Sequence, residues 1–146
     1  MFEFYLFLKL YFHFKHSLDY TYDFIQAMNK RKQKYFAYIS ICDLTHDWIN
    51  GGHYLDVPYH QMLTKLFYQN MLENTVVIFF SDHGFRLGKI RKTQTGEIEN
   101  RLPFIYIHFP EYIDNKYKDI IKQNQYRLTT HFDIHATLKH ILNGLY

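Results

Sequence analysis

Cysteine is nearly absent from this 146-residue chain, which contains only Cys42. A single cysteine excludes an intrachain disulfide and a zinc knuckle built on a Cys-x-x-Cys pair. The residues before it, 37–41, read Ala-Tyr-Ile-Ser-Ile and are typical of a buried strand. We therefore expect Cys42 to be a buried structural thiol, and one cysteine does not decide the redox compartment.

Familiar catalytic motifs and long apolar runs are missing as well. The sequence has no Gly-x-Ser-x-Gly elbow, no P-loop and no Gly-x-Gly-x-x-Gly fingerprint. The aromatic residues 1–14 are interrupted by Lys9, are too short to span a bilayer and lack a small-residue cleavage site. We expect residues 1–16 to form a strand or packing segment, or the irregular start of an incomplete chain.

Charge of one sign is not in large excess, since the net charge is +3 with histidine neutral. Lysine and arginine are scattered except in the run 30–34, which reads Lys-Arg-Lys-Gln-Lys. Such a run can contact phosphate, but it is more often a solvated helix end. This mild charge leads us to expect no nucleic-acid partner.

The sequence does contain a succession of helix-like and strand-like segments. Apolar residues at helical spacing predict helices at 17–34, 54–72 and 131–142. Continuous apolar runs predict buried strands at 35–42, 75–80 and 104–109. Pro58 should then lie in the first turn of the second helix, where proline is tolerated.

The type and order of these segments predict an α/β fold. Continuous apolar strands are typical of a mostly parallel sheet with helices on both faces. In such sheets ligands gather at the carboxyl ends of the strands. Two polar loops, 43–53 and 81–100, should leave from that edge. For a chain of this length we expect one domain, spanning residues 17–146.

The second predicted strand ends in Ser81-Asp82-His83-Gly84. A carboxylate and a neutral imidazole are good ligands for a divalent metal such as zinc, calcium, manganese or magnesium. Glycine after a strand end lets the two neighbouring side chains turn towards one point. Asp82 and His83 are therefore candidate metal ligands. The structural alternative is that Ser81 or Asp82 caps a turn.

Other candidate site residues follow the ends of the same predicted strands. His46, in Thr45-His46-Asp47, is a candidate for contacting a metal or an anionic substrate oxygen, although most loop histidines do neither. Lys89 and Arg91 lie just past the candidate metal ligands and suit a sulfate or phosphate ester. The competing interpretation is a solvated loop whose cations pair with acidic neighbours.

The last predicted helix opens at His131-Phe132-Asp133. Thr129 or Thr130 suits its N-cap position, and Asp133 suits the positive end of the helix dipole. This structural account is sufficient for these residues.

Together these segments resemble the alkaline phosphatase/sulfatase superfamily, and more narrowly the sulfatase-like family DUF229. Residues 74–104 carry most of the resemblance, including Ser-Asp-His-Gly at 81–84 and Arg-Leu-Pro-Phe at 101–104. Segments 44–47 and 128–138 support it.

The resemblance implies an alkaline phosphatase-like α/β/α sandwich that hydrolyses sulfuric or phosphoric esters with a divalent metal. It implies that Asp82 and His83 bind the metal and that His46 faces the substrate or a second metal. Lys89 and Arg91 would contact the anion. The metal would activate a Thr, Ser or formylglycine nucleophile. The resemblance also implies an extracellular or membrane-associated setting.

The chain departs from the superfamily pattern before Tyr35, where no residue lies in a setting suited to the nucleophile or to the first acidic ligand. We therefore expect the chain to correspond to the carboxyl-terminal half of such an enzyme, as a truncated gene model, a splice product or a decayed copy. With two ligands a metal should bind weakly.

Two functions follow as alternatives. The first is a fragment of a metal-dependent ester hydrolase, inactive or nearly so alone. The second is a non-catalytic pseudoenzyme or interaction module. In either case an incomplete sheet would leave an edge exposed, which favours self-association.

Overall fold

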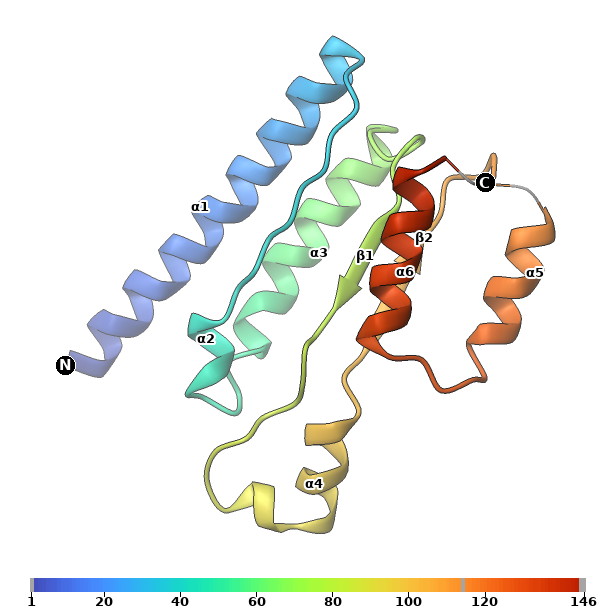
Figure 1. Cartoon of the computed structure of the whole chain (residues 1–146). Coiled ribbons are helices and arrows are strands. Elements are labelled where there is room, and N and C mark those ends of the chain that lie inside the picture. Colours follow the sequence, from blue (N-terminus) through green and yellow to red (C-terminus); the bar gives the residue numbers. More distant parts are fainter. Residues whose placement is uncertain (1, 114, 145–146) are drawn as a thin grey trace.

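The structure is a computed structural model that describes residues 2–113 and 115–144 (Figure 1). Most of the described chain is helical. In order, the elements are α1 Phe2–Arg31, α2 Asp43–His46, α3 His53–Tyr68, β1 Val77–Phe80, the 3-10 turn η1 Ile90–Lys92, α4 Gln94–Arg101, β2 Ile105–His108, α5 Asn115–Asn124 and α6 His131–Leu142. The two strands lie between α3 and the C-terminal helices (Figure 1).

The sheet does not have the predicted architecture. Within the described ranges it consists of β1 and β2 alone, and they pair antiparallel, with Val77 opposite His108 and Phe80 opposite Ile105. The predicted mostly parallel α/β/α sandwich is therefore wrong. A parallel pair needs a crossover that packs on the sheet. Here residues 85–101 instead form a separate lobe between the two strands. The chain then returns beside β1 in the opposite direction.

The predicted strand at 35–42 is also wrong. The segment is irregular and runs along α1 and α3, with Phe36 73% and Tyr38 69% exposed (Figure 1). Within the described ranges, its β-forming residues have no neighbouring strand to pair with, and a strand is stable only when its backbone groups are paired. Cys42 is consequently exposed rather than buried.

Helix α1 contains the predicted helix at 17–34 up to Arg31 and extends it back to Phe2. Residues 2–16 are thus helical rather than a strand, and they do form a packing segment, because Phe14 lies in the core with Phe7 and Leu10 packed against it. The helix ends because Lys32 adopts a left-handed backbone (φ 53°), and Gln33 N–H then donates to the carbonyl of Met28 at 3.0 Å. The basic run follows at this end and is exposed, as a solvated helix end is.

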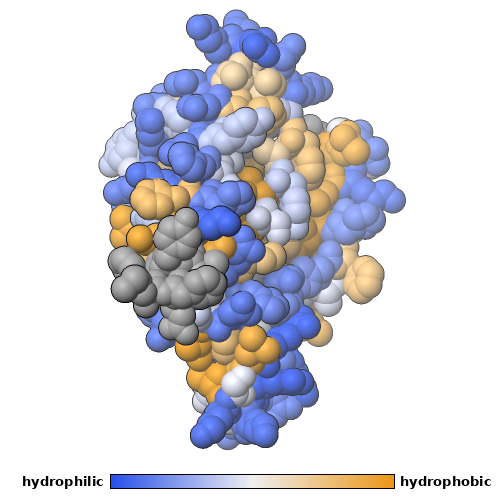
Figure 2. Space-filling model, turned by 90° about the vertical axis from the view of Figure 1, so that its left-hand side faces the viewer, coloured by the Kyte–Doolittle hydropathy of each residue, from blue (hydrophilic) through white to orange (hydrophobic). Residues whose placement is uncertain are grey.

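The core lies between α1 and its neighbours. Apolar side chains spaced three or four apart on α1 contribute to two clusters, which contain Phe14, Leu18, Leu44 and Leu55 in one and Tyr22, Ile25, Leu66 and Leu72 in the other. On the face of the molecule that carries α1, which lies at the left in Figure 1, patches of apolar side chains interrupt the polar surface (Figure 2). No helix in the described ranges combines the length and the apolar character needed to cross a membrane.

The two other predicted helices are confirmed with small changes. Helix α3 begins at His53, so Pro58 lies inside the helix rather than in its first turn. Helix α6 spans the predicted residues, and Thr130 is its N-cap. The Asp133 carboxylate accepts hydrogen bonds from the Thr130 backbone N–H at 2.7 Å and from the Thr130 hydroxyl at 2.8 Å. These two bonds, both donated by Thr130, fix the start of the helix.

Candidate functional site

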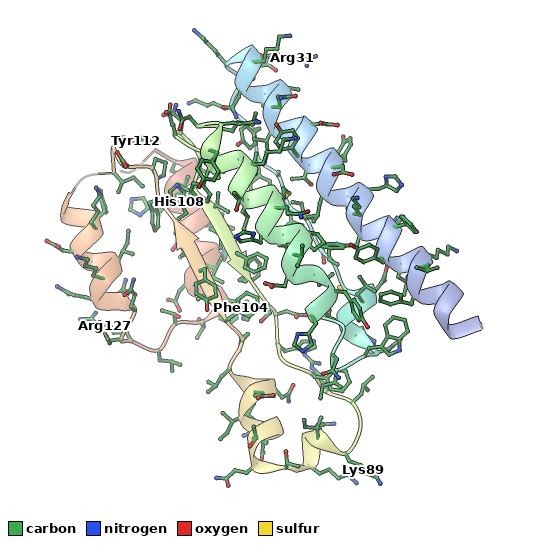
Figure 3. The ribbon with its side chains drawn as sticks, turned by 180° about the vertical axis from the view of Figure 1, so that it is seen from behind. Arg31, Lys89, Phe104, His108, Tyr112 and Arg127 are labelled. Carbon is green, nitrogen blue, oxygen red and sulfur yellow. The ribbon has the colours of Figure 1, made fainter. Side chains whose placement is uncertain are left out.

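The candidate site is the turn of residues 81–84, which leaves the end of β1. Its backbone is tied to the returning chain. Ser81 N–H donates to the Phe104 carbonyl at 3.1 Å, and Phe104 N–H donates to the Ser81 hydroxyl oxygen at 3.3 Å. Gly84 N–H donates to the Asn100 carbonyl at 3.2 Å. These bonds hold the segment after β1 beside the segment before β2, so the two chain segments stay in contact beyond the end of the sheet, near Phe104 in Figure 3.

The side chains of Asp82 and His83 meet in this turn. His83 Nε2 lies 3.3 Å from Asp82 Oδ2, and the His83 backbone N–H donates to Asp82 Oδ1 at 2.9 Å. His83 Nδ1 lies 2.7 Å from the Gly84 carbonyl oxygen. Because that oxygen can only accept, Nδ1 carries the hydrogen, and in a neutral imidazole Nε2 then keeps its lone pair, 3.3 Å from Asp82 Oδ2.

This arrangement fits the donor set of a divalent metal. A neutral imidazole nitrogen and a carboxylate oxygen this close together can both bind one cation. Two ligands bonded to zinc at about 2.0–2.2 Å in tetrahedral geometry are about 3.3–3.5 Å apart, close to the separation of Nε2 and Oδ2. An Nδ1–H bond to a backbone carbonyl is the usual support of a metal-binding histidine.

The pair is open to solvent, with the Asp82 side chain 79% and the His83 side chain 31% exposed. A metal therefore has direct access. Among the residues that the structure describes, however, no three His, Cys, Asp or Glu side chains converge on one point. The turn thus supplies two ligands, fewer than the three or four that metals usually take from protein.

His46 lies apart from this pair. It is the last residue of α2, and its Nδ1 is 2.6 Å from Asp47 Oδ1, with both side chains largely exposed. None of the hydrogen bonds or ion pairs between described residues joins His46 to Asp82 or His83. The structure thus joins the two predicted metal ligands and leaves the role of His46 as a prediction.

Lys89 and Arg91 lie in the lobe formed by residues 85–101, where Lys89 precedes η1 and Arg91 belongs to it. Both are exposed, and Lys89 marks the far end of the lobe in Figure 3. Neither has an ion-pair partner within residues 2–113 and 115–144. Arg101, by contrast, pairs with Glu97 at 2.7 Å on α4, so one of the acidic neighbours does neutralise a cation here.

The sequence of this chain matches a known protein family. A family model described as a protein of unknown function (DUF229) matches residues 11–145. The chain belongs to the DUF229 family. DUF229 is a sulfatase-like family, which agrees with the resemblance carried by residues 74–104. Comparisons with curated proteins and with solved structures found no match.

Two residues beside the site in this DUF229 chain were not predicted from the sequence to belong to it. His131 Nε2 lies 3.0 Å from the Ser81 carbonyl oxygen, and its ring lies 6.1 Å from that of Phe80. The side-chain oxygen of Asn100 is buried and accepts no hydrogen bond from the described residues. The sequence assigned His131 a structural place at a helix start, and it gave no signal for Asn100, which lies in the polar helix α4.

Proposed function

We propose that this DUF229 chain provides a divalent-metal site for hydrolysis of sulfuric or phosphoric esters, with Asp82 and His83 as ligands. The observation that carries the proposal is the orientation of His83. Its Nδ1 donates to the Gly84 carbonyl, and its Nε2 lies 3.3 Å from Asp82 Oδ2. The sulfatase-like character of the family supports the substrate class.

The mixed oxygen and nitrogen donors suit Zn, Ca, Mn or Mg, and do not select among them. When bound, the metal would supply positive charge that polarises an ester oxygen. Asp82 would bring a compensating negative charge, and His83 would hold a fixed neutral donor. Lys89 and Arg91 are proposed to attract the anionic ester, and His46 is proposed to contact it. The proposed setting is extracellular or membrane-associated.

Alone, this polypeptide is expected to turn over little or no ester. Two ligands hold a metal weakly, and no nucleophile is identified beside Asp82 and His83 in the described residues. The proposal is therefore a claim about metal binding first. Activity is expected where further ligands and a nucleophile are supplied to the same turn.

The test is a calorimetric titration of the purified chain with Zn²⁺. Asp82→Ala and Asp82→Asn should each weaken binding by at least about 10-fold, the loss expected when a site loses a supporting carboxylate. Asp47→Ala is the matched control, because Asp47 is also an exposed aspartate paired with an adjacent histidine. The chain has ten histidines, so binding is judged by the difference between variants. Equal affinity in the Asp82 variants and the unaltered chain would show that the assignment is wrong.

A non-catalytic interaction module is the second candidate. Its support is the segment between α5 and α6 and the start of α6, where Tyr126 is 91%, Leu128 90% and Phe132 86% exposed. Large apolar side chains exposed together often mark an interaction surface. The two candidates are separated by the Zn²⁺ titration of Asp82→Ala, because an interaction module without a metal site has no Asp82-dependent binding to lose.

A further inference from the structure

His131 joins the last helix to the candidate metal site. It is the first residue of α6, and its Nε2 lies 3.0 Å from the carbonyl oxygen of Ser81, fifty positions earlier in the chain. A carbonyl oxygen only accepts, so Nε2 must donate. The ring also lies 6.1 Å from the ring of Phe80, the last residue of β1. His131 thus contacts the two residues that lead into Asp82.

The Ser81 carbonyl belongs to the peptide unit that joins Ser81 to Asp82. The preceding peptide unit is held by the bond from Ser81 N–H to Phe104. The one that follows His83 is held by the bond from Gly84 N–H to Asn100. Between these two anchors, the bond from His131 restrains the peptide plane from which the Asp82 side chain departs.

We propose that His131 is a positioning residue, which holds Asp82 and His83 in their metal-binding arrangement through the Ser81 carbonyl. The inference rests on the proposed metal-binding function and deepens it. Helix α6 has no fully buried residue, so packing alone holds its first residue loosely and the hydrogen bond matters. The bond does not depend on the charge of His131, because Nε2 carries its hydrogen in the donating neutral tautomer and in the imidazolium alike.

Two substitutions separate the hydrogen bond from the ring. His131→Phe keeps an aromatic ring beside Phe80 but removes the donor. His131→Gln removes the ring but keeps an N–H donor of similar reach. In Zn²⁺ titrations, His131→Phe should weaken the Asp82-dependent binding by about 10-fold, as losses of supporting hydrogen bonds around metal sites do. His131→Gln should stay within about 3-fold of the unaltered chain, a smaller loss than that range.

The same pair controls for histidine as a metal ligand, because both variants remove the imidazole. Equal losses in the two variants would overturn the positioning role and indicate that His131 itself binds the metal. No loss in His131→Phe would overturn it as well.

A second measurement works without metal. Hydrogen exchange of the Gly84 amide in the metal-free chain should accelerate in His131→Phe and remain unchanged in His131→Gln, while exchange in β1 stays the same in both. If the unaltered chain bound no metal, the proposed function would fail, and this exchange pattern alone would decide whether His131 fixes the turn. Unchanged Gly84 exchange in His131→Phe would then overturn the inference too.

Discussion

At the scale of single residues, the site depends on a close backbone contact at Gly84. A Cβ atom built on Gly84 would lie 2.2 Å from the carbonyl oxygen of Glu99, well inside van der Waals contact. Gly84 also supplies the carbonyl that accepts from His83 Nδ1 and the N–H that donates to the Asn100 carbonyl. Gly84 therefore links the turn of residues 81–84 to the lobe that carries Lys89 and Arg91.

Gly84→Ala should lower the free energy of unfolding by about 2–3 kcal/mol, because backbone atoms on both sides must move to accept the methyl group. Urea denaturation measures this loss. Gly52→Ala is the matched control, since Gly52 has a helical backbone (φ −58°) and a Cβ there would meet nothing within 4 Å. It should change stability by less than about 1 kcal/mol, towards greater stability. A Gly84→Ala variant as stable as Gly52→Ala would contradict the close contact.

The sequence predicted part of the site. An apolar strand that ends in Asp82, His83 and glycine was enough to predict that two side chains meet there. The tautomer of His83 was not predictable, because it depends on how the Gly84 carbonyl turns. His131 could not be assigned either, since its contact with Ser81 exists only after α6 has folded against the end of β1.

At the scale of secondary-structure elements, α6 shows how a short polar pair defines a helix start. The Asp133 carboxylate accepts two hydrogen bonds from Thr130. Both bonds stabilise the charged carboxylate and therefore lower the pKa of Asp133. The bond from the Thr130 hydroxyl has the larger effect, and the bond from the Thr130 backbone N–H has the smaller one. His131 lies within the turn that this pair stabilises.

The lowered pKa predicts a pH dependence of α6. The folded pKa of Asp133 lies below the unfolded value of about 3.9, so its contribution is complete above that pH and is lost as the pH falls through the folded pKa. Thr130→Val should raise the pKa of Asp133, measured by NMR titration of its carboxyl carbon, because the hydroxyl bond is gone. Thr129→Val, the neighbouring alternative cap, should leave it unchanged. Equal shifts in the two variants would refute the assigned cap.

Element positions were easier to predict than element pairing. The runs at 75–80 and 104–109 contain β1 and β2, because apolar β-forming residues between polar segments mark strands well. Their relative direction depends on what the chain does between them. It folds through close backbone contacts at Gly84 and Gly96, and no apolar pattern records such contacts. The run at 35–42 has strand-like composition but no partner strand, so composition alone misplaced it.

At the scale of the whole molecule, the described chain has a helical core beside an open sheet. Helix α3 contacts the strands through Tyr59 with Phe79 and through Phe67 with His108. With two strands in the described part of the sheet, each strand has one edge without a neighbour. Strand β2 is one of these edge strands, and the side chain of its Tyr106 is 69% exposed. Such an edge favours pairing with another strand.

This open edge predicts self-association that grows with protein concentration and is independent of metal. Tyr106→Lys should shift the sedimentation profile towards the monomer, because a charged side chain on an edge strand opposes pairing with a second copy. Tyr112→Lys is the control, since Tyr112 is similarly exposed, at 60%, but lies beyond the end of β2 (Figure 3). Association should survive Asp82→Ala, which alters only the proposed metal-binding turn. If Tyr106→Lys and Tyr112→Lys reduced association equally, general surface charge and not the strand edge would be responsible.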